Sequence, residues 1–225
     1  EYIAEVAREF VAWSRSPDNN RAPGNTCMAS CRELARDLAW RAPGHNASKG
    51  CGTAMRTAPI GLAWHGDEER IIRMAAETSA LTHGHPAAIA GGVGTALLVH
   101  WALDAVEPAE MLRRLVDRTR SISNEFVAKI EQVPAVLDHE PESAYAVLGD
   151  AWFADEAIAC ALYAFWRSPD DYRRTVVTAV NMDGDSDSVG CIAGAISGAR
   201  ASPRNAGTCC IRKPRRARPT SGCRR

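Results

Sequence analysis

An acidic turn at residues 181–188, which runs directly into a stretch of small and aliphatic residues, constrains the fold most strongly. Gly190, Gly194 and Gly198 recur every four residues in that stretch, so on a helix they share one face that carries no side chains. Such a face can lie close against another helix. We therefore expect an all-α fold, a compact multi-helix bundle, with the acidic turn deep inside it.

The acidic turn carries groups that can bind a metal ion. Asp183, Asp185 and Asp187 alternate with Gly and Ser, and oxygens at alternate positions can face one point, as a hard cation such as Mg²⁺ requires. The helix start that follows favours nearby negative charge and keeps these side chains ionised. An EF-hand loop is excluded because it would need Gly at Ser188 and Glu at Gly194. A solvated turn that only caps the helix is the alternative, although a cap needs one Asp rather than three.

Charge is unevenly spread along the 225 residues, although the formal net charge is +0. Residues 201–225 hold eight Lys or Arg and no acid, so residues 1–200 are net acidic by eight. An acidic body has no electrostatic footprint for nucleic acid, and we expect no nucleic-acid partner. We expect residues 1–200 to form the domain and residues 201–225 to be a disordered basic tail, with a nucleic-acid-binding arm as its alternative.

Cysteine usage and hydropathy bear on the compartment of the protein. The five Cys before the tail form no CxxC pair and have no His at zinc-finger spacing. No secretory signal is visible, so we expect reduced, mostly buried thiols and a cytoplasmic protein.

The nearly uncharged run Pro86–Leu103 is rich in Ala and Gly and contains His100, which indicates a buried core helix rather than a membrane span. Because the chain begins at Glu1 inside an amphipathic pattern, we expect a fragment.

Residues 50–59, Gly-Cys-Gly-Thr-Ala-Met-Arg-Thr-Ala-Pro, are called the glycine loop below. Two Gly just before an apolar stretch let backbone N–H groups approach a phosphate at a helix start, and a larger side chain at Gly52 is expected to block that approach. No Gly-Lys-Ser/Thr closes the loop, so it is not a P-loop, and a simple Gly-rich turn is the alternative. His83 and His85 follow at a predicted helix end, where they could serve a ligand or only the free helix carbonyls.

Helical periodicity dominates the chain. Asp155 and Glu156 open one of the predicted helices, either as ordinary first-turn acids or with Glu156 projecting toward the acidic turn. The pattern predicts helices over residues 2–14, 25–41, 50–63, 68–82, 86–104, 107–118, 120–133, 141–147, 154–166, 170–180 and 188–200.

The glycine loop, Leu81-Thr82-His83 and Gly184-Asp185-Ser186-Asp187-Ser188, in this order, together resemble the ADP-ribosylglycohydrolase family. The resemblance covers residues 1–200. It implies an all-α fold of the ADP-ribosylglycohydrolase type with a pair of Mg²⁺ or Mn²⁺ ions at the centre of a cleft. It also implies hydrolysis of the glycosidic bond that joins ADP-ribose to a protein side chain or related group, so the expected partner is an ADP-ribosylated protein or a small ADP-ribose conjugate.

By this resemblance, Asp185, Asp187 and Ser188 match metal ligands, and the two Asp are the candidate catalytic residues. The ions would orient a ribose hydroxyl or water and offset charge as the bond breaks. The family's other metal ligands lie in early segments that should precede Glu1, so we expect this chain to be impaired. A catalytically inactive ADP-ribose-binding module is the alternative. The substrate-binding candidates are Gly50, Cys51, Gly52, Met55 and His83.

Overall fold

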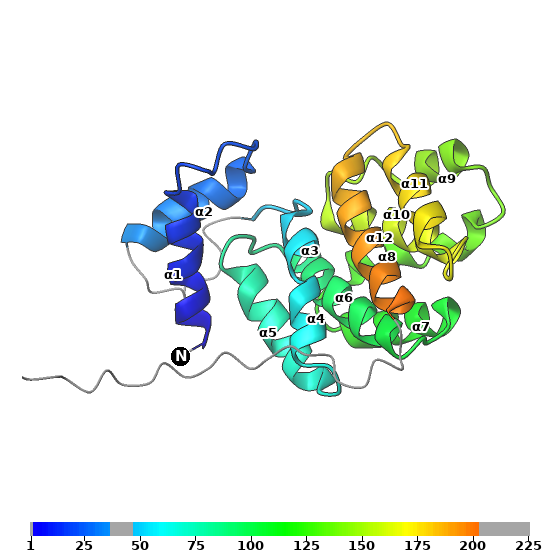
Figure 1. Ribbon diagram of the computed structural model, residues 1–225, viewed down its shortest axis with the longest axis horizontal. Helices are drawn as coiled ribbons and strands as arrows, with labels where there is room; N and C mark the ends of the chain where they lie inside the picture. Colours follow the sequence, from blue (N-terminus) through cyan, green and yellow to red (C-terminus); the bar gives the residue numbers. More distant parts are fainter. Residues whose placement is uncertain (1, 37–46, 203–225) are drawn as a thin grey trace, which may run out of the picture.

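The computed structural model describes residues 2–36 and 47–202, and within these ranges the regular structure is helical (Figure 1). One isolated antiparallel β-bridge, between Gly50 and Phe153, is the single extended pairing in this part of the chain. The all-α prediction is therefore confirmed. The helices are α1 (Tyr2–Ser14), α2 (Asn25–Arg36), α3 (Gly52–Arg56), α4 (Ala58–Ala63), α5 (Glu68–Ala80), α6 (Pro86–Leu103), α7 (Pro108–Thr119), α8 (Asn124–Ile130), the 3₁₀ turn η1 (Val133–Val136), α9 (Pro141–Leu148), α10 (Ala154–Trp166), α11 (Tyr172–Val180) and α12 (Ser186–Ala201).

Helix α6 is the centre of the molecule. Its residues from Ala87 to Ala102, apart from the half-buried Ile89, are buried, and α3, α4, α5, α10 and α12 all pack against it. Small residues make this possible, because a Cβ at Gly61 of α4 would lie 2.1 Å from the carbonyl oxygen of Ala96. The core-helix interpretation of Pro86–Leu103 is confirmed, since 83% of this apolar window is buried inside the protein.

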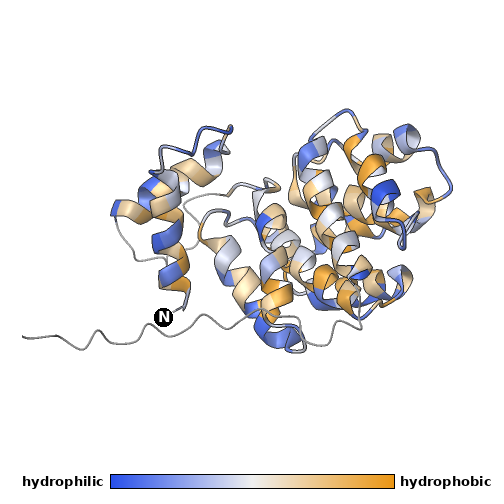
Figure 2. Cartoon of the chain, in the orientation of Figure 1, coloured by the Kyte–Doolittle hydropathy of each residue, from blue (hydrophilic) through white to orange (hydrophobic). Residues whose placement is uncertain are grey.

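Helix α10 forms the second layer of the core. Every residue from Ala154 to Phe165 is buried except Glu156, and α10 packs on α6, α8, α11 and α12. Figure 2 shows the polar residues gathered at the connecting turns, such as the one between α1 and α2.

Helix α12 packs side by side with α11 (Figure 1). The glycine face predicted on α12 accounts for this contact, because a Cβ at Gly190 would lie 2.6 Å from Val180 Cγ1. The expected depth of the acidic turn is wrong, however. Asp183 and Asp187 are exposed, while Asp185 and Ser188 are buried, because the close helix packing begins only after the turn has ended.

Two predicted helices differ from the observed ones, one because it is divided and one because it starts later. The 50–63 stretch divides at Thr57, whose hydroxyl donates to the Gly92 carbonyl at 2.7 Å, and Pro59 in the first turn of α4 has no N–H to continue the α3 ladder. The 120–133 stretch starts only at Asn124, because Ser123 adopts an extended conformation and caps α8 by accepting from the Phe126 N–H. From position 203 onward, the predicted basic tail lies outside the described residues. Residues 37–41 of the predicted 25–41 helix also lie outside them.

Candidate active centre

The structure brings the glycine loop and the acidic turn together. The Cys51 thiol donates to Asp185 Oδ2 at 3.0 Å, and the Cys51 Sγ lies 3.4 Å from Ser188 Oγ. The Ser188 hydroxyl in turn donates to Met55 Sδ at 3.1 Å. Four of the residues that the sequence analysis selected therefore meet, although more than 130 positions separate the two segments in sequence.

A short extended pairing positions the glycine loop. The Cys51 N–H donates to the Trp152 carbonyl at 3.1 Å, and the Ala154 N–H donates to the Lys49 carbonyl at 2.9 Å. Helix α3 then begins at Gly52. The first N–H groups of a helix have no partner within it, so this start offers free donors beside the acidic turn.

His83 lies directly beneath the loop. An ideal Cβ at Gly50 would lie 3.4 Å from His83 Nε2, and one at Gly52 would lie 3.3 Å from His83 Cε1 and 3.5 Å from Cys27 Sγ. A Cβ at Gly52 would therefore point toward His83 and Cys27, while the effect of a larger side chain on the approach of a ligand stays a prediction. His83 is only 2% exposed, so it packs against the glycine loop from the protein interior.

Hydrogen bonds and burial keep the His83 ring neutral. Arg56 Nη2 donates to Thr82 Oγ1 at 2.7 Å, and Thr82 Oγ1 lies 2.8 Å from His83 Nδ1, within hydrogen-bonding distance. Burial, chiefly, and the nearby Arg56 charge lower the pKa of His83 to about 4. The ring is therefore neutral at pH 7, and its Nε2 is the atom that faces Gly50.

Arg56 ties the loop to the end of α5. Its guanidinium donates to the carbonyl oxygens of Gly52 at 3.2 Å and Thr78 at 3.0 Å, and it lies 5.1 Å from the Phe10 ring centroid. The sequence analysis gave this Arg no role in the site. Its position at the end of the Gly-x-Gly-x-x-Met-Arg run was the available signal.

The acidic turn is held by backbone contacts with the loop before α10. The Asp185 N–H donates to the Asp150 carbonyl at 2.8 Å, and a Cβ at Gly184 would lie 2.3 Å from that same oxygen. Glycine is therefore required at 184 by a close backbone approach. Glu156 packs against Gly149, the residue before Asp150. A Cβ added at Gly149 would lie 2.6 Å from the Cδ of Glu156.

The donor set of the turn suits a hard cation. Asp185 and Asp187 supply carboxylates and Ser188 supplies a hydroxyl at the start of α12. Neither carboxylate has a Lys, Arg or His partner among residues 2–36 and 47–202. The pKa of the Cys51 thiol is raised to about 12, chiefly by burial and also by the hydrogen bond to Asp185. This sulfur is therefore a neutral donor to the carboxylate.

Lys49 and two aromatic residues flank the loop on its outer side. Lys49 Nζ lies 3.3 Å from the buried Asp155 carboxylate and 4.7 Å from the Phe153 ring centroid. Trp152 is 60% exposed and Phe153 is 45% exposed. This aromatic pair was not among the residues predicted for the site, although two adjacent aromatic residues before a helix start were a visible signal in the sequence.

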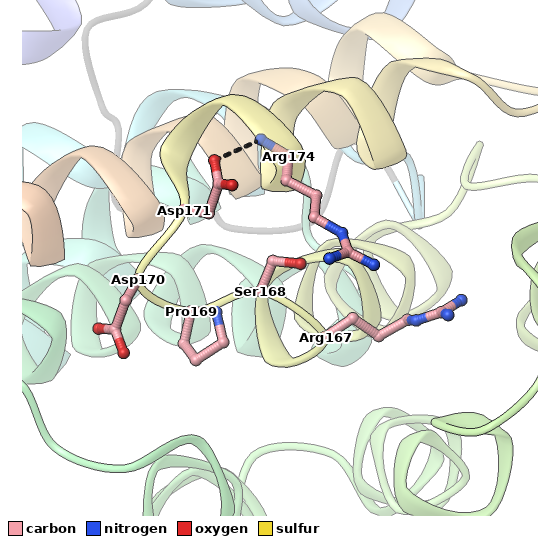
Figure 3. Close-up of a pocket in the computed structure, with 6 residues that line it drawn as sticks. All are labelled: Arg167, Ser168, Pro169, Asp170, Asp171 and Arg174. Atoms are coloured by element: carbon pink, nitrogen blue, oxygen red, sulfur yellow. Dashed lines mark hydrogen bonds between the residues drawn. The ribbon is translucent and has the colours of Figure 1, made fainter.

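Figure 3 shows a different hollow, on the surface near the start of α11, lined by Arg167, Ser168, Pro169, Asp170, Asp171 and Arg174. The dashed line marks the Asp171 carboxylate accepting from the Arg174 N–H at 2.9 Å, which caps α11. Arg200, near the end of α12, reaches Asp170 at 2.8 Å, so the hollow lies toward the opposite end of α12 from the acidic turn. It contains none of the candidate site residues.

The fold and the site together define an all-helical protein in which a glycine loop and an oxygen-rich acidic turn meet at two helix starts. The family model for ADP-ribosylglycohydrolase matches residues 1–203, and the chain belongs to this family.

Named relatives agree with this assignment. The chain is 27% identical to ADP-ribosylhydrolase ARH3 of Mus musculus, in an alignment that covers 87% of this chain and 62% of that protein. It is 25% identical to the ADP-ribosyl-[dinitrogen reductase] glycohydrolase of Rhodospirillum rubrum over 88% of this chain and 60% of that protein. An uncharacterized protein of Archaeoglobus fulgidus is 31% identical over 81% of this chain and 59% of that protein.

A solved structure described as an ADP-ribosylglycohydrolase-related protein complex has a TM-score of 0.67 at 24% identity, covering 90% of this chain and 66% of that one. This likeness confirms the fold. The chain spans about three fifths of the length of the curated relatives above.

Proposed function

We propose that this chain carries part of the active centre of a metal-dependent hydrolase that releases ADP-ribose from a protein side chain or a related acceptor. The observation that carries the proposal is the 3.0 Å contact between Cys51 of the glycine loop and Asp185 of the acidic turn. It places backbone donors suited to phosphate beside oxygen ligands suited to a divalent cation.

Asp185, Asp187 and Ser188 would hold Mg²⁺ or Mn²⁺. Two bound metal ions would orient a ribose hydroxyl or water and offset the charge that develops as the glycosidic bond breaks. The chain itself fixes Asp185 through its N–H bond to the Asp150 carbonyl. Ser188 donates its hydrogen to Met55 Sδ, which leaves its oxygen lone pairs available to a cation.

The glycine loop would bind the diphosphate of ADP-ribose. The start of α3 supplies N–H groups and a favourable local field for negative charge. Lys49 lies at the same edge, but its charge is already balanced by Glu125 at 2.5 Å and Asp155 at 3.3 Å. The exposed faces of Trp152 and Phe153 offer surfaces on which a flat base can stack. His83 would act through the loop, because it holds the backbone of Gly50 and Gly52 from below.

A catalytically inactive ADP-ribose-binding module is the second candidate, and one observation favours it. Within the described ranges, one group of three or more His, Cys, Asp or Glu side chains has ligand atoms within 4.8 Å of one another, and it lies away from the acidic turn. Two carboxylates and a hydroxyl offset less of the dehydration cost of Mg²⁺ than a fuller carboxylate set would.

The deciding experiment measures ADP-ribose release from an ADP-ribosylated protein with Mg²⁺, Mn²⁺ or a chelator, beside ADP-ribose binding by calorimetry. We expect metal-dependent release that falls at least tenfold in Asp185→Asn and Asp187→Asn. Asp183→Asn is the matched control, because Asp183 lies in the same turn, is exposed and is not assigned as a ligand. Binding without release under every metal condition would support the module. Equal losses in all three variants would show that the turn contributes only general charge.

A further inference from the structure

A second group of metal-ligating side chains lies at the other end of α6. His65, His100 and Asp104 each offer one ligand atom, and these atoms all lie within 4.8 Å of one another. His65 Nε2 is 3.0 Å from Asp104 Oδ1, and the rings of His65 and His100 meet edge to face with centroids 4.8 Å apart. His100 and Asp104 are four positions apart at the end of α6, so they lie on one side of it.

This group is separate from the candidate active centre. The glycine loop contacts the first half of α6, where the Thr53 hydroxyl donates to the Ala88 carbonyl at 2.6 Å. Ala88 and His100 are twelve positions apart, which corresponds to about 18 Å along a helix. A ligand bound at one end does not share side chains with a ligand bound at the other.

His100 has an unsatisfied ring nitrogen. The residue is 5% exposed, and its Nδ1 is buried without a hydrogen-bond partner among the described residues. Its Nε2 lies 3.8 Å from Glu68 Oε1, which also accepts from Trp101 Nε1 at 2.8 Å. With the ring proton on Nε2, which faces Glu68 Oε1, Nδ1 carries a lone pair that has no partner among the described residues. An edge-to-face histidine pair that served only packing would leave Nδ1 unsatisfied.

We propose that His65, His100 and Asp104 bind one divalent transition-metal ion, for which Zn²⁺ is the best match. Two imidazole nitrogens and one carboxylate oxygen are a common three-residue zinc set, with a water completing the tetrahedron. Metal–ligand bonds of about 2.1 Å place tetrahedral ligands about 3.4 Å apart, so a pair at the 4.8 Å limit closes by about 1.4 Å. His65 and Asp104 are exposed and can make that adjustment. Glu68 Oε1 lies 3.8 Å from the other ring nitrogen of His100, so its negative charge favours a proton on that nitrogen.

Positive charge near the group is already paired. Arg114, which faces His100, donates to Glu110 Oε1 at 2.8 Å. Arg118 donates to Glu68 Oε2 at 2.6 Å and to Glu69 Oε1 at 2.8 Å. The bound ion would link the turn between α4 and α5 to the last turn of α6, and it would stabilise the fold without any contact with the acidic turn.

The test titrates Zn²⁺ into the chelator-treated full chain by calorimetry. We expect the wild-type chain to bind one more equivalent than the double variant His65→Asn/Asp104→Asn, or to bind that equivalent at least tenfold more tightly. The substituted residues are exposed, so the variant keeps its fold, and circular dichroism checks this. His139→Asn is the matched control, because His139 is an exposed histidine outside the group.

Two further measurements separate this site from other metal binders. Asp185→Asn removes a proposed ligand at the acidic turn and should leave the Zn²⁺ equivalent unchanged, whatever the outcome for the proposed function. Co²⁺ bound by His and Asp should give weak visible bands without thiolate charge-transfer absorption. An unchanged affinity in the double variant, loss of the equivalent in Asp185→Asn, or a strong thiolate band would overturn the proposal.

Discussion

The glycine loop is held on three sides, whereas the acidic turn is held by one backbone bond and by two side-chain contacts with that loop. Trp152 and Ala154 pair with the backbone of Cys51 and of the preceding Lys49, His83 packs against the loop and Arg56 ties it to α5. In the turn, the Asp185 N–H donates to the Asp150 carbonyl, Asp185 accepts from the Cys51 thiol and Ser188 donates to Met55. Asp187 remains exposed.

This difference separates two tasks within one site. Backbone donors recognise a ligand by shape and must stay in place, so their support is spread over many neighbours. Carboxylates supply charge, and an exposed carboxylate can rearrange around an ion. We therefore expect perturbations of the loop to act through stability, and substitutions of the carboxylates of the turn to act through ligand affinity.

The largest expected effect concerns the support beneath the loop. Folding lowers the pKa of His83 to about 4, so the unfolded chain takes up the proton first as the pH falls. The stabilisation is therefore fully present above pH 6.5, is lost between about 6.5 and 4, and levels off below that range. We expect a loss of up to about 3 kcal/mol in the wild-type chain that His83→Gln does not show.

Urea unfolding of both chains at several pH values between 4 and 7.5 measures this difference. Other groups with lowered pKa values, such as His100, contribute equally to both chains and cancel. Parallel stability profiles for the two chains would mean that His83 is not buried in neutral form.

The next effect tests the close backbone approach of the turn. Gly184→Ala places a Cβ 2.3 Å from the Asp150 carbonyl oxygen, which should cost about 1–3 kcal/mol through a forced backbone shift. Gly24→Ala is the matched control, because nothing lies within 4 Å of its added Cβ. Denaturant unfolding measures both, and Mn²⁺ calorimetry on folded Gly184→Ala should show weaker binding. Equal stability in the two variants would argue against the contact.

A smaller effect concerns the link between the two regions. Cys51→Val removes the only hydrogen bond from the loop to Asp185 recorded within the described ranges, and we expect a loss of about 1 kcal/mol. Cys51→Ser keeps a donor and should stay closer to the wild-type stability. Thermal unfolding of the three chains measures this order. If Cys51→Ser were the less stable variant, the hydrogen bond would matter less than the packing of the sulfur.

The sequence predicted the helical class and the core helix α6, because both depend on local periodicity and side-chain type. A site shared by the glycine loop and the acidic turn was implied only by the family resemblance, since the contact joins residues far apart in sequence. The sequence did not predict how the site is supported. The role of Gly184 depends on Asp150, and that of Gly52 on His83, so both are contacts across the fold. The expected burial of the acidic turn was wrong because the glycine face of α12 describes the helix and not the turn that precedes it.

The smallest effect concerns thiol reactivity at the junction. Cys51 is buried and its pKa is raised to about 12, whereas Cys191 is exposed at the surface. Partial desolvation of its sulfur, chiefly, and the Asp187 charge raise the pKa of Cys191 as well. Only the thiolate reacts with an alkylating reagent, and the reagent must also reach it. We expect iodoacetamide at pH 8 to label Cys191 well before Cys51, as measured by peptide mass spectrometry over time. Cys160, buried and away from the site with a pKa also near 12, is the matched control and should follow the time course of Cys51. Faster labelling of Cys51 than of Cys160 would show that the loop and the turn separate in solution, and the contact between the two regions would then be transient.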